Sequence, residues 1–167
     1  WLSPAAATDS TALLDAFCVR DYRTFDQDPR FGLLVLAEIA SKALSPAIND
    51  PGTAIEIIGR GMRVLSNWRQ TAPQQAEVTY PQVFVLPLQL SELFDDFYTP
   101  IARDGAAMLE VQIRLQKSLQ ALSDQHSEFR SHALRHSAAA LARAEHAMAY
   151  SEDIKKLKAL HQQLRDS

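Results

Sequence analysis

The fold is decided by residues 28–69, which read DPRFGLLVLAEIASKALSPAINDPGTAIEIIGRGMRVLSNWR. An Asp-Pro pair stands at two places in this stretch, at Asp28-Pro29 and at Asp50-Pro51. An Asp side chain can accept a hydrogen bond from a free N–H group in the first turn of a helix. Proline at the first helical position has its φ angle preset and lacks an N–H that would have no partner there. The two pairs therefore predict helices over about 29–44 and about 51–69.

The two predicted helices differ in how their apolar residues are distributed. The first is apolar on most of its faces, which predicts a central and buried helix. The second has one apolar face, formed at helical spacing by Ile55, Ile58, Met62 and Leu65. It also contains Gly59 and Gly61, which lower helix propensity and permit a close helix approach.

The rest of the chain reads as further helices with short connections. We expect Ser91 to cap a helix that Pro100 kinks or divides, and apolar spacing predicts helices over about 106–122, 129–150 and 151–164. Residues 83–88 (VFVLPL) are at most a short edge strand, since Pro87 interrupts them. The prediction is an all-α fold, a helical bundle of six or seven helices. Residues 1–167 should form a single soluble domain.

Composition and motifs reduce the number of function classes that the sequence favours. The formal net charge of −3 does not favour a nucleic-acid partner. The single cysteine, Cys18, cannot form an internal disulfide. The sequence contains no glycine-rich phosphate loop, no GxSxG and no CxxC. We therefore expect no cofactor and no catalytic residue. The sequence does not decide whether the protein is an enzyme, and we prefer a non-enzymatic role.

Residues 23–54, RTFDQDPRFGLLVLAEIASKALSPAINDPGTA, carry a family resemblance. This stretch and the later LFDDFYTPIARDGA (93–106) resemble the bacterial family of predicted membrane proteins called domain of unknown function 2254. The resemblance covers most of the chain. It implies membrane-spanning segments ahead of this region and an activity that is not established. We therefore expect the chain, which starts at Trp1, to be the soluble C-terminal portion of a longer protein.

The polar residues around the two Asp-Pro pairs allow two interpretations. In the structural one, Ser45 before Pro46 ends the first helix, and the junction is completed by Pro51. In the functional one, polar side chains form a pocket for a small ligand or cation. The candidate pocket residues are Arg23, Asp26, Asp28, Asn49, Asp50 and Thr53.

Two other groups of residues allow an interpretation as metal sites. Asp95, Asp96, Tyr98, Arg103 and Asp104 can offer carboxylates to Mg²⁺ or Ca²⁺, although a solvated acidic face with local arginine pairs explains them as well. His132 and His136 lie one helical turn apart, a spacing that can bind zinc, but no further ligand is evident. Surface histidines on an alanine-rich helix are the preferred interpretation, and we expect no metal.

These observations favour a non-enzymatic assembly or regulatory domain of a bacterial membrane protein. The alternatives are a ligand- or ion-sensing module that uses the candidate pocket, and a metal-dependent enzyme. We expect the parent protein in the bacterial inner membrane, attached through spanning segments absent from this fragment, with this domain on the cytoplasmic side. We also expect a homo-oligomer, because the first helix is apolar nearly all round. An alanine-rich surface can support it, formed by Ala133, Ala138, Ala139, Ala140, Ala142, Ala144, Ala147 and Ala149.

Overall fold

The computed structural model describes residues 21–25, 28–68 and 87–167. These residues form the helices α2 (Pro29–Ala43), α3 (Pro51–Ser66), α4 (Leu90–Asp104), α5 (Leu109–Gln125), α6 (Ser127–Ala147) and α7 (Ser151–Asp166). The described ranges contain no strand, so the predicted all-α fold is confirmed. Residues 83–86 of the expected edge segment, and Cys18, lie outside the described residues.

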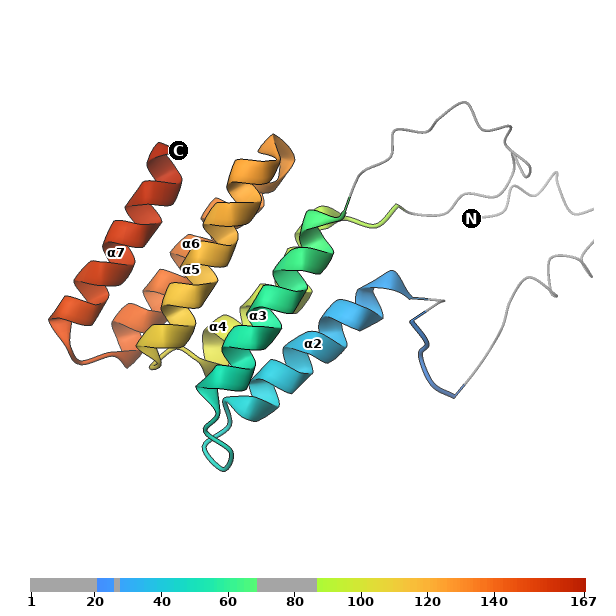
Figure 1. Cartoon of the computed structure of the whole chain (residues 1–167), viewed down its shortest axis with the longest axis horizontal. Coiled ribbons are helices and arrows are strands. Elements are labelled where there is room, and N and C mark those ends of the chain that lie inside the picture. The colour runs from blue at the N-terminus through green and yellow to red at the C-terminus, as the bar shows by residue number, and fades with distance from the viewer. Residues whose placement is uncertain (1–20, 26–27, 69–86) are drawn as a thin grey trace, which may run out of the picture.

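The helices stand side by side in two layers with a single helix at each end (Figure 1). In one layer α3 packs against α5, and in the other α4 packs against α6. Helix α2 contacts α3 and α4 at one end of this array, and α7 contacts α5 and α6 at the other end. The array therefore has two end helices, each of which turns one side away from the other described helices.

Aromatic side chains from α4 and α6 form the centre of the core. Phe94, Phe97, Tyr98 and Phe129 are all at most 1% exposed. Gly61 brings α3 close to this cluster, because a Cβ added at Gly61 would lie only 2.0 Å from the Phe97 ring. At Gly61 the close approach is therefore between α3 and the Phe97 side chain, rather than between two helix backbones as predicted.

The beginnings of α2 and α3 follow the sequence prediction closely. The Asp28 carboxylate accepts a hydrogen bond from the Arg30 N–H at 3.0 Å, and the Asp50 carboxylate accepts one from the Thr53 N–H at 3.0 Å. Each helix has its proline at the start. The two Asp-Pro pairs are helix starts, and the capping interaction predicted for each aspartate is confirmed.

The predictions for α4 are met only in part. Pro100 does not divide the helix, which runs without a break from Leu90 to Asp104, and a kink at Pro100 stays a prediction. Proline removes one backbone hydrogen bond from the helix. Burial of the side chains of Phe97 and Ile101 on either side of Pro100 compensates for this loss. Ser91 is not the cap: the cap position is Gln89, which makes no side-chain capping bond. The next helix, α5, begins at Leu109 rather than near 106.

Helix α2 is not the central helix that its composition predicted. It lies at the end of the array and buries one side, which carries Leu33, Ala37 and Ala40, against α3 and α4. The error has a physical source. Apolar residues all round a helix indicate that every side is to be covered, and they do not say whether the cover comes from the same chain.

Candidate functional site

The residues of the candidate pocket fall into two separate groups. At the start of α2, Arg23 forms an ion pair with Asp28, with its Nε donating to the Asp28 carboxylate at 2.8 Å. The Arg23 guanidinium also lies 5.2 Å from the centre of the Phe31 ring. The hydrogen bond and charge of Arg23 lower the pKa of Asp28 against the opposing effect of burial. The Asp28 carboxylate therefore already accepts hydrogen bonds from Arg23 and from a backbone N–H in the first turn of α2.

Arg30, which the sequence analysis did not single out, ties the same end of α2 to α4. Its guanidinium donates two hydrogen bonds to the Asp96 carboxylate, at 2.7 and 3.0 Å, and a third to Glu92 at 2.7 Å. Hydrogen bonding to Asp96 is the main reason that the pKa of Arg30 is raised. Position 30 follows an Asp-Pro helix start, yet nothing local in the sequence identifies its partners, which are 62 and 66 residues away.

The second group surrounds the turn between α2 and α3. The Thr53 hydroxyl donates to Asp50 at 2.6 Å, and these bonds to Thr53 lower the pKa of Asp50. Asn49 has a φ of 50°, in the left-handed region that asparagine tolerates. The Ser45 hydroxyl donates to the Lys42 carbonyl at 2.7 Å, and the Ser45 carbonyl accepts from the Asn49 N–H at 2.8 Å. The residues of this group thus bond mainly to one another.

The structure does not bring the two groups together. Asp28 precedes α2 and Asp50 follows it, so the two groups lie at opposite ends of that helix, as Figure 1 shows. A helix of 15 residues is about 22 Å long. Asp26 lies outside the described residues. A single pocket built from Arg23, Asp28, Asn49, Asp50 and Thr53 is therefore not formed. The contacts within each group are those of helix starts and a turn, in which Pro46 and Pro51 also stand.

The acidic residues of α4 point in different directions. Asp96 faces Arg30 of α2, whereas Asp95 faces α6, where Arg135 lies 2.9 Å away and His136 lies 3.2 Å away. Asp104 pairs with the adjacent Arg103. The arginine partners of Asp95 and Asp96 come from other helices rather than from the local sequence.

Tyr98 does not belong to an exposed acidic face. It is 1% exposed, and its hydroxyl lies 3.1 Å from the Ser118 hydroxyl of α5. Burial strongly raises the pKa of this phenol, with smaller opposing effects from Ser118 and Arg114. The side chain is therefore a neutral part of the core and cannot act as a metal ligand from the surface.

His136 is a buried residue, contrary to the expectation of surface histidines. It is 6% exposed and lies against the rings of Phe94 and Tyr98, whose centres are 5.8 and 5.9 Å away. Burial and the charge of Arg135 lower its pKa to about 4, although Asp95 acts in the opposite direction. The pKa of His132 is lowered too, chiefly by burial. Among the described residues, no group of three or more His, Cys, Asp or Glu side chains is arranged to hold a metal ion.

A buried polar network that the sequence analysis missed joins α5, α6 and α7. The Ser137 hydroxyl donates to the Gln116 side-chain carbonyl and lies 2.7 Å from Nδ1 of His161. The Gln116 amide in turn donates to the Ser137 carbonyl at 3.0 Å. Ser137 is 0% exposed, so a substrate cannot reach its hydroxyl and the Ser–His pair is structural. Ser137 lies 21 residues from Gln116 and 24 from His161, so no local sequence pattern identifies these partners.

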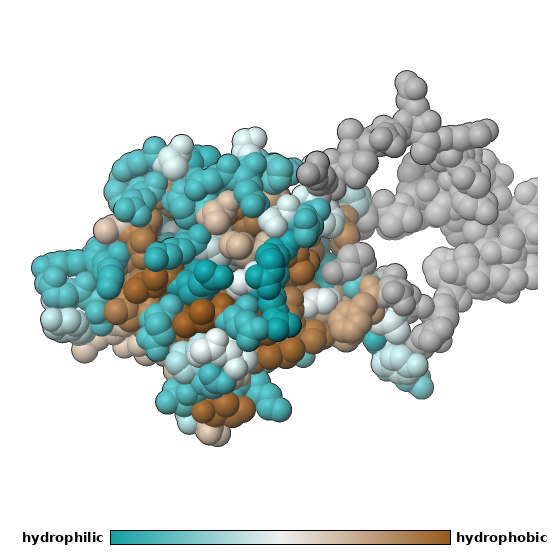
Figure 2. All heavy atoms as spheres, viewed as in Figure 1, coloured by the Kyte–Doolittle hydropathy of each residue, from teal (hydrophilic) through white to brown (hydrophobic). Residues whose placement is uncertain are grey.

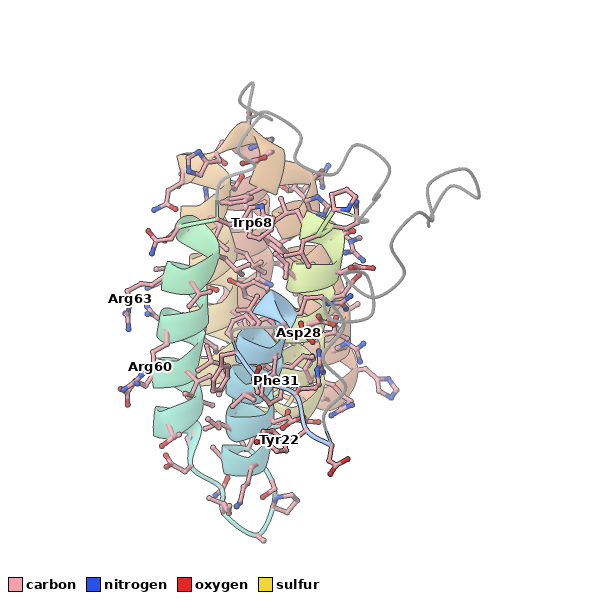
Figure 3. All side chains as sticks on the ribbon, turned by 90° about the vertical axis from the view of Figure 1, so that its right-hand side faces the viewer. Tyr22, Asp28, Phe31, Arg60, Arg63 and Trp68 are labelled. Atoms are coloured by element: carbon pink, nitrogen blue, oxygen red, sulfur yellow. The ribbon has the colours of Figure 1, made fainter. Side chains whose placement is uncertain are left out.

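The outward side of α2 carries apolar side chains that are only partly buried. We define the outer face of α2 as Phe31, Val35, Glu38, Ile39 and Lys42, which share one side of the helix by their spacing. Ile39 is 43% exposed. Figure 3 looks onto this side of the molecule, and Figure 2 shows hydrophobic residues at the surface at the end of the array where α2 lies.

The residues before α2 extend this apolar surface. The Phe25 ring lies 5.0 Å from the Phe31 ring, and Phe25 itself is 64% exposed. Tyr22 is 68% exposed and lies on the same side of the molecule as Phe31 (Figure 3). The aromatic side chains of this short segment therefore lie beside the outer face of α2 and leave much of their own surface open.

The opposite end helix provides an internal comparison. On α7, helical spacing places Lys155, Ala159, Gln162 and Asp166 away from the array, and all four are exposed. An end helix that faces water is expected to be polar on its outer side, as α7 is. The outer face of α2 departs from this pattern with three large apolar side chains out of five residues.

Comparisons with known proteins place the chain among uncharacterised relatives. A family model described as "Predicted membrane protein (DUF2254)" matches residues 1–121. Uncharacterized proteins of Mycobacterium bovis and Mycobacterium tuberculosis are each 58% identical to the chain over 36 residues. This stretch is 22% of the present chain and only 7% of each relative. No solved structure matches the chain significantly. Among the described helices, none has the length and apolarity needed to cross a bilayer.

Proposed function

Because this chain belongs to the DUF2254 family of predicted membrane proteins, we propose that its helical array is a non-enzymatic assembly region that joins two copies of the protein. The observation that carries the proposal is the apolar outer face of α2, which the described residues cover only in part: Phe31 and Val35 are half-buried and Ile39 is 43% exposed. Burying exposed apolar side chains is the main source of free energy in most protein association. The proposed interface is accordingly α2 against α2 of a second copy.

The charges on the outer face favour a second copy of this chain as the occupant. In an antiparallel pair with its two-fold axis beside Ile39, Glu38 of each copy lies close to Lys42 of the other. The two copies then present the same patch to each other, as a two-fold interface requires. Tyr22 and Phe25 enlarge the apolar area toward the roughly 1,000 Å² that a stable pair buries in total.

The alanine-rich surface of α6 is a weaker basis for assembly. Three of its members are buried within one chain and are at most 1% exposed: Ala133, Ala140 and Ala144. The remaining members, among them Ala138 and Ala142, are exposed but offer one methyl group each. We therefore assign the interface to α2 rather than to α6.

We propose further that the whole protein resides in the bacterial inner membrane, with this helical region outside the bilayer on the cytoplasmic side. The family description supports the membrane part of this proposal, and the mycobacterial relatives support the bacterial part. In the whole protein, pairing through α2 would bring two membrane-embedded portions together. The side of the membrane can be tested with a membrane-impermeant thiol reagent on a cysteine placed at exposed Tyr150.

Thiol crosslinking tests the proposed pair directly. Cys18 is first replaced by serine, and Ile39→Cys is then introduced as the only cysteine. Tyr150→Cys, between α6 and α7, is the matched control, because Tyr150 is also exposed but lies away from α2. A short bifunctional thiol crosslinker should convert Ile39→Cys to a covalent dimer in preference to the control. Equal and low crosslinking of both variants would refute the α2 interface.

A further inference from the structure

Two arginines from different helices converge over Gly59 on the other side of α3. A Cβ added at Gly59 would lie 2.7 Å from an amino nitrogen of Arg114 and 3.8 Å from one of Arg63. These two amino nitrogens therefore lie no more than about 6.5 Å apart. Arg114 comes from α5 and Arg63 from the last turn of α3. Figure 3 shows Arg63 projecting from α3 away from α2, so this surface is distinct from the outer face of α2.

Neither arginine has a carboxylate partner within ion-pair distance among the described residues. This contrasts with Arg23, Arg30, Arg103 and Arg135, each of which pairs with an aspartate. Arg60, the nearest arginine on α3, pairs with Glu56. Arg130, Arg143 and Arg165 have no ion-pair partner among the described residues either. What distinguishes Arg63 and Arg114 is that two such guanidinium groups approach the same position, Gly59.

The Arg114 guanidinium is also partly enclosed. Its Nε is buried and has no hydrogen-bond acceptor among the described residues. A buried polar donor without an acceptor is costly, and two like charges close together add to that cost. Arg63 alone is explained by the favourable position of a cation in the last turn of a helix. That explanation does not extend to Arg114, which lies in the first half of α5.

We propose that Arg63 and Arg114 form a binding site for a phosphate group, with Gly59 leaving the space in which the Arg114 guanidinium lies. Planar guanidinium groups donate paired hydrogen bonds to phosphate oxygens, and two of them can hold one dianion. The absence of a side chain at Gly59 matters because even a methyl group would displace Arg114. The phosphate comes either from a soluble phosphate compound or from the headgroup of an anionic lipid. This inference goes beyond the proposed assembly role and does not depend on it.

The first experimental arm measures binding of inorganic phosphate to the whole chain by nuclear magnetic resonance, at ionic strength held constant with chloride. Arg63→Gln and Arg114→Gln should each weaken phosphate binding by about tenfold, as loss of one charged donor predicts. Arg143→Gln, an exposed arginine on α6, removes the same charge and should leave binding unchanged. Gly59→Ala keeps both arginines but displaces one of them, and should also weaken binding.

The second arm distinguishes the two sources of the phosphate group. Vesicles of three parts phosphatidylcholine to one part phosphatidylglycerol are compared with pure phosphatidylcholine in a sedimentation assay. Binding to the anionic vesicles that is lost in Arg63→Gln and kept in Arg143→Gln identifies a lipid headgroup. Phosphate binding without vesicle binding identifies a soluble phosphate. The proposal is overturned if Arg63→Gln and Arg114→Gln bind phosphate as well as Arg143→Gln does, or if phosphate has no effect beyond that of chloride.

Discussion

At the scale of single residues, Gly59 and Gly61 show how two similar positions on α3 acquire different roles. The sequence predicted a close approach at both, but it could not identify what approaches. Gly61 faces the buried ring of Phe97, whereas Gly59 faces the flexible end of Arg114. The neighbours of a glycine depend on which helices pack against it, and that information lies in residues more than 35 positions away.

This difference predicts opposite results for two alanine substitutions. Gly61→Ala forces a methyl group into the Phe97 ring, which has no room to move, and should lower the free energy of unfolding by about 2 kcal/mol or more. Gly59→Ala displaces only the end of Arg114 and gains up to about 1 kcal/mol of helix propensity. Urea unfolding of the two variants checks this. Equal losses of stability in both would contradict the packing described here.

His136 predicts a pH dependence of stability. Its pKa is lowered from the ordinary 6.5 to about 4 in the folded protein, mainly by burial and by Arg135. The unfolded chain therefore binds a proton at this position at higher pH than the folded protein does. Stability should be complete above about pH 6.5 and should fall as the pH drops toward 4, by up to about 1.4 kcal/mol per pH unit.

Urea unfolding between pH 4.5 and 7.5 measures this slope. His136→Gln should reduce the slope, while His146→Gln, at an exposed position on the same helix, should not. Some slope should remain in His136→Gln, because the pKa values of His132 and His161 are also lowered by burial. A slope that is the same in both variants would show that His136 is not responsible.

At the scale of helices, local signals predicted well and long-range contacts were not predictable. Both Asp-Pro starts are where the sequence indicates, because a cap and its helix are within three residues of each other. The residues of the candidate pocket do not come together because each aspartate caps its own helix. Asp28 lies at the start of α2 and Asp50 at the start of α3, and the length of α2 separates them. Partners such as Asp96 for Arg30 depend on the packing of α2 against α4, which no local pattern encodes.

The network of Ser137, Gln116 and His161 predicts a cost for a small change in the packing of α5, α6 and α7. Ser137→Ala leaves the buried Gln116 carbonyl without its donor and should lower the free energy of unfolding by about 1–3 kcal/mol. Ser131→Ala, at an exposed position on α6, is the control and should have little effect. Adding Gln116→Leu removes the unpaired group, so the double variant should lose less than the sum of the single losses. A fully additive result would mean that the two side chains are not coupled.

Arg30 predicts a weaker link between α2 and α4. Arg30→Met keeps the aliphatic length but removes the hydrogen bonds to Asp96 and Glu92. Because these groups are partly exposed, solvent screens the pair, and we expect a loss of only about 1 kcal/mol. The loss should shrink as salt concentration rises. An unfolding midpoint that is unaffected at low salt would show that this ion pair does not hold α2 in place.

At the scale of the whole molecule, the array has two unlike ends. The outer side of α7 is polar and the outer face of α2 is largely apolar, although both helices cover one end of the same two layers. The sequence did signal that α2 is meant to be covered. It could not show that the described part of the chain covers the outer face of α2 only in part, and this partial cover is the basis of the proposed assembly role.

Molar mass in solution, measured by light scattering after size exclusion, tests the central claim most directly. At tens of micromolar, the chain should elute with twice the 18.6 kDa mass of a single copy. Ile39→Glu, which places a charge in the middle of the outer face of α2, should elute at 18.6 kDa, and Tyr150→Ser should remain paired. A single 18.6 kDa species for the unmodified chain, or a pair that survives Ile39→Glu, would contradict the account.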